Sequence, residues 1–199
     1  SETAYYGVAC SIISGLTILF HSVGNAILPW KYEQLKDKRY DIIRKLDNRI
    51  LVGLAVITLI FISLSPEVVN LLFTDSYYQA ALCIPALATG TFYNYVSSLF
   101  ATVETYYEKT KYIAYGMIIS TGVNVLLNLT LIGYFGYIVC AYTTAFSYLV
   151  YAVLHTIFVR SAFRGLIMEL YNKTVLLTIC ILIVPLTAII FFLYPYPVI

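Results

Sequence analysis

The stretch that decides the fold is TVLLTICILIVPLTAIIFFL, which runs from Thr174 to Leu193. It contains no charged residue, and its only strongly polar groups are threonine hydroxyls. An α-helix rises 1.5 Å per residue, so about 20 residues cross the roughly 30 Å of hydrocarbon in a bilayer. The stretch therefore predicts a membrane-spanning helix, with Pro185 inside it.

Five further runs without Asp, Glu, Lys or Arg lie between the charged segments. They cover 4–28, 50–64, 77–103, 112–133 and 138–159. We expect the first to end at Pro29 and the third to kink at Pro85. The run 50–64 is short and needs extra length from either Asp41–Arg49 or Val68–Phe73. With 174–193, these runs predict an all-α integral membrane protein that is a bundle of six transmembrane helices.

The composition supports the same class. Hydrophobic residues make up 61% of the chain and charged residues 11%, whereas a soluble domain carries about a quarter charged residues to cover its surface. The 12 Lys and Arg residues are nearly balanced by 10 Asp and Glu residues, for a net charge of +2. This balance argues against nucleic acid as a partner, because phosphate binding needs a basic face.

Lys and Arg residues occur in only three of the predicted loops. They follow the first, third and fifth runs: Lys31, Lys36, Lys38, Arg39, Arg44, Lys45, Arg49, Lys109, Lys111, Arg160, Arg164 and Lys173. The loops after the second and fourth runs contain Glu67 and Asp75 but no basic residue. The positive-inside rule makes the basic loops cytoplasmic. The segment from Lys31 to Arg49 is either a solvated loop or a basic amphipathic helix on the inner leaflet.

Polar residues within the runs are the candidate functional groups, because hydrocarbon cannot satisfy their hydrogen bonds. One stripe at helical spacing lies on the first run, at Ser14, Thr17, His21, Ser22 and Asn25. His21 and Asn25 either line a hydrated path, with His21 protonatable, or bond to a neighbouring helix. The same two interpretations apply to Asn124 and Asn128 on the fourth run. His155, on the fifth, is interpreted as a packing residue.

Glu104 directly follows the third run. It is either an interfacial carboxylate near Lys109 and Lys111 or a cation or proton site coupled to transport. The basic residues Lys31, Arg160 and Arg164 could collect an anionic headgroup at the cytoplasmic mouth. No nucleotide-binding or metalloprotease motif is present, and the four cysteines are isolated in apolar stretches. We therefore expect no enzyme activity, no metal and no cofactor.

Several motifs follow one another in an order that resembles a known family. They include YGVA at 6–9, SPE at 65–67, YYEKTK at 106–111, NVLLN at 124–128 and IGYFG at 132–136. They resemble the polysaccharide and O-antigen flippases of the multidrug/oligosaccharidyl-lipid/polysaccharide exporter superfamily. The likeness covers nearly the whole chain. Gly133 stands where that family usually has proline.

The resemblance implies that residues 1–199 form most of the carboxy-terminal lobe of a two-lobe exporter. It implies movement of an undecaprenyl-diphosphate-linked oligosaccharide across the bacterial plasma (inner) membrane by alternating access. The implied partners are this lipid-linked oligosaccharide, membrane lipid and an amino-terminal lobe of the same chain. The alternatives are a drug or other lipid-linked exporter of the superfamily and a membrane-embedded glycan polymerase or transferase. An external loop bearing Arg or His would favour the enzyme.

Overall fold

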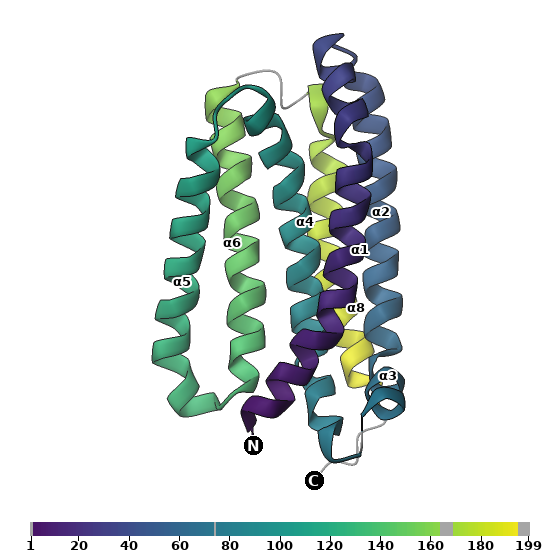
Figure 1. Ribbon diagram of the computed structural model, residues 1–199, viewed down its shortest axis with the longest axis vertical. Helices are drawn as coiled ribbons and strands as arrows, with labels where there is room; N and C mark the ends of the chain where they lie inside the picture. The colour runs from purple at the N-terminus through teal and green to yellow at the C-terminus, as the bar shows by residue number, and fades with distance from the viewer. Residues whose placement is uncertain (1, 74, 164–168, 195–199) are drawn as a thin grey trace.

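Long helices run side by side through the computed structural model, which describes residues 2–73, 75–163 and 169–194 (Figure 1). The long helices are α1 (Glu2–Lys36), α2 (Tyr40–Ser63), α4 (Ile84–Tyr106), α5 (Lys111–Phe135), α6 (Ile138–Ala162) and α8 (Lys173–Phe192). Between α2 and α4 lie the short helix α3 (Ser65–Leu72) and the 3₁₀ helix η1 (Asp75–Leu82). No strand occurs in the described residues, so the all-α prediction is confirmed for them.

Five helices, α1, α2, α5, α6 and α8, are long and apolar enough to cross a membrane. Their outer faces carry large apolar side chains, such as Ile18, Leu126 and Ile181, which are 65%, 63% and 66% exposed. A water-soluble protein rarely leaves so many apolar residues on its surface. These faces therefore indicate a membrane protein, as the composition predicts.

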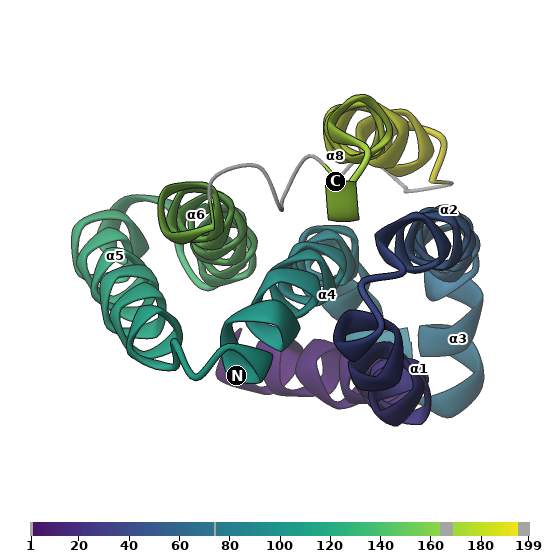
Figure 2. The same ribbon diagram turned by 90° about the horizontal axis from the view of Figure 1, so that it is seen from above.

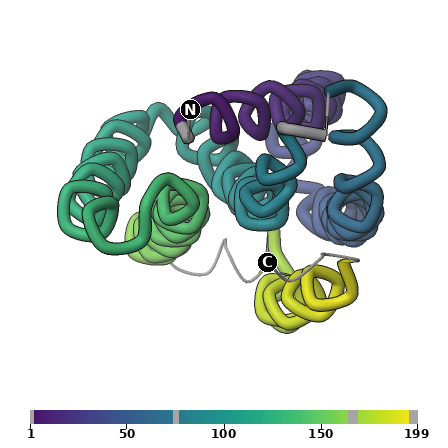
Figure 3. Tube along the Cα trace, turned by 90° about the horizontal axis from the view of Figure 1, so that it is seen from below, coloured from purple at the N-terminus to yellow at the C-terminus, as the bar shows by residue number. Residues whose placement is uncertain are grey.

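Helix α4 is the centre of the bundle and differs from the other five. It packs against α6, α1, α2 and α8 (Figures 2 and 3), and most of its residues are buried. Its serine and threonine hydroxyls donate hydrogen bonds to carbonyls of the same helix, as Thr89 does to the Pro85 carbonyl at 2.8 Å. Because other helices cover it, α4 can carry polar residues that a lipid-facing helix could not.

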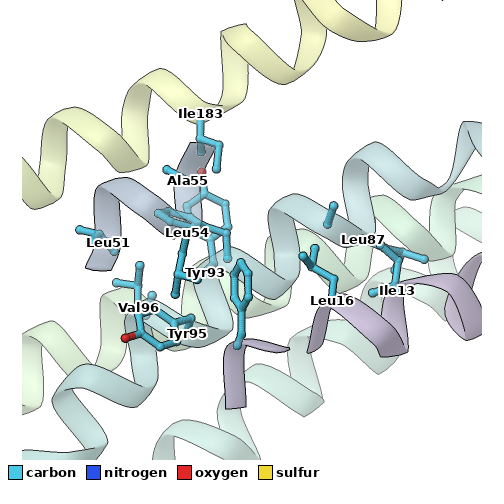
Figure 4. Close-up of a cluster of buried hydrophobic side chains, with 14 of the residues drawn as sticks. Ile13, Leu16, Leu51, Leu54, Ala55, Leu87, Tyr93, Tyr95, Val96 and Ile183 are labelled. Atoms are coloured by element: carbon cyan, nitrogen blue, oxygen red, sulfur yellow. The ribbon is translucent and has the colours of Figure 1, made fainter. Parts of the chain in front are cut away.

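The apolar core lies where α1, α2, α4 and α8 meet. Leu16, Leu54, Leu87, Val96 and Ile183 pack there (Figure 4). In addition, the hydroxyl of Tyr93 on α4 donates to the Cys180 carbonyl of α8 at 3.0 Å. The core thus fixes α4, and with it the polar residues that this helix carries.

Two predictions about prolines were wrong. Pro29 does not end α1, which continues to Lys36, because the buried Leu35 and Lys31 hold the last turns against the bundle. Pro85 does not kink one long helix. It lies in the first turn of α4, where proline needs no hydrogen-bond donor, after the separate helix η1.

Helix α2 gains its length on its amino-terminal side. It begins at Tyr40, so the stretch Asp41–Arg49 is a continuous part of this helix. That stretch is neither a solvated loop nor a separate surface helix, and it packs Ile43 and Asp47 into the bundle.

The charges are unevenly distributed between the two ends of the bundle. We define the basic end as the end at which α1, α4 and α6 finish and α2, α5 and α8 begin, at the top of Figure 1. All described Lys and Arg residues lie in the connections or half-helices of this end. Which side of a membrane this end faces stays a prediction.

Candidate functional site

A polar cavity of about 190 Å³ lies between α1, α4 and α6. It is lined by Thr17, Phe20, His21, Gly24, Asn25, Leu28, Thr91, Asn94, Tyr95, Ser98, Ala101, Thr102 and Tyr151. None of these lining residues is Asp, Glu, Lys or Arg. The cavity is therefore polar without carrying a fixed charge.

The serine and threonine hydroxyl groups that line the cavity donate to carbonyls of their own helices. Thr91 donates to Leu87 at 3.1 Å, and Thr102 donates to Ser98 at 2.8 Å. A hydroxyl oxygen that donates one hydrogen bond still has lone pairs that can accept another. The hydroxyls thus remain hydrogen-bond acceptors for a group in the cavity.

Three other lining residues, His21, Asn25 and Asn94, have no side-chain hydrogen bond within the described part of the chain. His21 and Asn25 lie one turn apart on α1 and are exposed, while Asn94 is half-buried on α4. Each amide can donate and accept at once. These side chains therefore offer hydrogen bonds that the bundle itself does not use.

A buried pair of ionisable residues joins α4 to α6 close to the cavity. Glu104 Oε2 lies 2.8 Å from His155 Nδ1, and both side chains are completely buried. The distance is that of an ion pair, but the two groups are not oriented as in a hydrogen bond. Glu104 Oε1 and His155 Nε2 form no hydrogen bond with any described residue. Among the described residues the Glu104 carboxylate therefore pairs with His155, and not with Lys109 or Lys111 as the interfacial interpretation expects.

Tyr151 connects this pair to the cavity. Its ring lines the cavity and also packs edge-on against His155, with ring centroids 4.4 Å apart. Gly116 on α5 makes the space for it, because a Cβ atom there would lie 2.9 Å from Tyr151 Cε2. The pair, the ring and the cavity thus form one continuous packing arrangement.

A second buried ion pair lies on the other side of α4. Lys31 Nζ is 2.8 Å from Asp47 Oδ2, and their side chains are 3% and 2% exposed. The expectation that Lys31 lies free at the cytoplasmic mouth is therefore wrong. Since α1 does not end at Pro29, it carries Lys31 into the interface with α2.

Tyr171, in the connection before α8, lies near both buried pairs. Its hydroxyl donates to the Leu99 carbonyl at 2.7 Å, and its ring packs 4.9 Å from that of Phe100. Burial, followed by the charges of Asp47 and Glu104, raises the pKa of Tyr171 well above its ordinary value. The neutral phenol therefore holds this connection against α4.

The expected path residues fall into two groups. His21 and Asn25 line the cavity, whereas Asn124 and Asn128 lie between α5 and α6 and do not. Thr143 donates to Asn128 Oδ1 at 2.5 Å, and Asn128 Nδ2 donates to Asn124 Oδ1 at 3.1 Å. The second group therefore uses its hydrogen bonds within α5 and between α5 and α6.

The expected cytoplasmic-mouth residues are also separated. Arg160 is exposed at the basic end, and Arg164 lies outside the described residues. In the part of the chain that the structure describes, no group of His, Cys, Asp and Glu could hold a metal ion.

Sequence reasoning missed the α4 side of the cavity. Thr91, Asn94, Ser98 and Thr102 repeat every three or four residues, which is the signal that identified the stripe on α1. It also missed the pairing of Glu104 with His155, for which a single sequence contains no signal.

The chain matches no family model, no curated protein and no solved structure. Its function therefore has to be inferred from the cavity and from the charges buried beside it.

Proposed function

We propose that the chain forms most of one lobe of an alternating-access exporter in the bacterial plasma membrane. Its proposed substrate is an undecaprenyl-diphosphate-linked oligosaccharide, as the sequence resemblance implies. The observation that carries the proposal is the uncharged polar cavity between α1, α4 and α6, inside a bundle with apolar outer faces.

A polar headgroup loses its hydration when it crosses hydrocarbon, and each unsatisfied polar group costs several kcal/mol. His21, Asn25 and Asn94 offer replacement hydrogen bonds about halfway along α1 and α4. Transporters commonly bind substrate near the bilayer midplane, at the interface between two repeats. The exposed face of α1 that carries His21 and Asn25 would meet the second lobe at such an interface.

In this proposal α4 also spans the membrane, so that it and the five apolar helices make six transmembrane helices. Its own polarity is tolerated because α1, α2, α6 and α8 surround it. The basic end faces the cytoplasm under the positive-inside rule. Arg160, and Arg164 by its place in the sequence, would attract the diphosphate there.

Site-specific photo-crosslinking tests the substrate. A photoreactive amino acid replaces Asn25 at the cavity or Leu126 on the apolar face of α5. Membranes that contain the full chain are supplied with radiolabelled undecaprenyl-diphosphate oligosaccharide. The proposal expects strong labelling from position 25 that unlabelled substrate competes away, and weak labelling from position 126 that it does not. Equal, non-competed labelling from both positions would refute it.

A further inference from the structure

The chemistry of the cavity selects against charged ligands. A bound anion would need positively charged side chains or hydrogen-bond donors without acceptors beside them, and a hard cation such as Ca²⁺ would need carboxylate oxygens. The lining contains no Asp, Glu, Lys or Arg. The unbonded amides of Asn25 and Asn94 each present a donor beside an acceptor. A ligand hydroxyl group also donates and accepts, so hydroxyls match this lining.

Aromatic rings provide the apolar part of the cavity. Phe20 from α1 and Tyr95 from α4 pack edge-to-face, with centroids 5.8 Å apart, and Tyr151 contributes a third ring from α6. Ligand sites typically combine apolar and aromatic walls with a few placed polar groups. A compact ring with an apolar face and a hydroxyl-bearing edge fits both parts.

The size limits the ligand to one such ring. The cavity encloses about 190 Å³, which is below the roughly 300 to 1,000 Å³ of sites for drug-sized ligands. A chain of several rings could therefore enter only one unit at a time.

The buried ionisable residues close to the cavity are already paired with one another. Lys31 is paired with Asp47, and His155 with Glu104, each at 2.8 Å and buried. A diphosphate in the cavity would find no Lys or Arg among the lining residues, and His21 is the one lining side chain that could become positively charged.

We infer that this cavity binds a single neutral, hydroxyl-bearing ring, and that it leaves the diphosphate of a lipid-linked substrate outside. The inference deepens the proposed function and rests on it for the identity of the larger substrate. The ring class follows from the lining itself.

Gly24 provides a way to fill the cavity without removing a polar group. A Cβ atom at Gly24 would meet only Tyr95 Cε2, at 3.9 Å, which is an ordinary contact. A phenylalanine there would start without a clash and occupy the cavity. Gly15, on the same helix, has nothing within 4 Å of such a Cβ and does not line the cavity. Gly15→Phe is therefore the matched control.

The test measures saturation-transfer NMR on the full chain in lipid nanodiscs, with methyl β-glucopyranoside as the probe. The parent chain and Gly15→Phe should transfer saturation to the sugar ring protons. Gly24→Phe should abolish the transfer, and Asn94→Leu should weaken binding about tenfold, since it removes up to two hydrogen bonds. Circular dichroism checks that every variant is folded.

Three results would overturn the inference: no transfer to the sugar in the folded parent, unchanged transfer in Gly24→Phe, or displacement of the sugar by inorganic pyrophosphate. The crosslinking experiment separates this inference from the proposed function. Sugar binding without crosslinking of the lipid-linked substrate refutes the function alone, while crosslinking without sugar binding refutes the inference alone.

Discussion

Replacing His155 by leucine should destabilise the bundle by about 3 to 5 kcal/mol, because Glu104 is then buried without its partner. The size of this destabilisation follows from the geometry of the pair. Both side chains are completely buried and 2.8 Å apart, so solvent screens neither the attraction nor the cost of an isolated charge. Since proteins are typically stable by only about 5 to 15 kcal/mol, the loss is a large part of the total.

The double variant Glu104→Met with His155→Leu should lie within about 1.5 kcal/mol of the parent. Removing both ionisable groups relieves the desolvation cost that a buried pair carries. The edge-on contact between Tyr151 and His155 is also lost, which costs about 0.5 to 1.5 kcal/mol. The double variant is therefore expected to be more stable than the single variant, although it contains one more substitution.

The assay is reversible unfolding in mixed micelles, followed by far-UV circular dichroism. Lys45→Met is the control, because Lys45 and Asp41 form an exposed pair at 3.8 Å on the same helix. Screening by solvent limits such a pair to about 0.3 to 0.5 kcal/mol. If His155→Leu unfolds like Lys45→Met, or if the double variant is less stable than the single one, the account of the buried pair is wrong.

Three other predictions concern packing, the cavity and topology. Gly116→Ala should cost about 1 to 3 kcal/mol, since its Cβ would lie 2.9 Å from the Tyr151 ring, whereas Gly122→Ala has open space and should be neutral or stabilising in the same unfolding assay. The double variant His21→Leu with Asn25→Leu should reduce glycan export more than protein level, and normal glycan display would assign both residues to a structural role. In a background without native cysteines, Lys38→Cys and Arg164→Cys should resist an impermeant thiol reagent added outside intact cells, while Asp75→Cys should react. Labelling at position 38 would reverse the predicted topology.

The helices were predictable because long apolar runs leave few alternatives. The ends of the helices were not, because they depend on tertiary contacts. Lys31 and Leu35 keep α1 helical beyond Pro29 only because α2 and the rest of the bundle cover them. Likewise, the helix breaks between η1 and α4, and the continuous apolar run 77–103 gives no sign of this break.

The cavity was predictable on one side only. The polar stripe with His21 and Asn25 stands out on an otherwise apolar helix. Asn94 lies in a helix whose polar residues face different neighbours, with Thr89 beside Thr187 of α8 and Thr91 at the cavity, so its role depends on which neighbours cover which face. The partnership of Glu104 with His155 is a contact between residues far apart in sequence, and composition and spacing do not encode it.

The central claim is that a water-accessible polar cavity lies inside a membrane-embedded bundle. The most direct test is thiol accessibility at Asn94→Cys, compared with Leu126→Cys on the apolar face of α5, in membrane vesicles of both orientations. We predict that an impermeant thiol reagent labels position 94 from at least one side and leaves position 126 unlabelled. A folded Asn94→Cys variant that stays unlabelled from both sides would contradict the account.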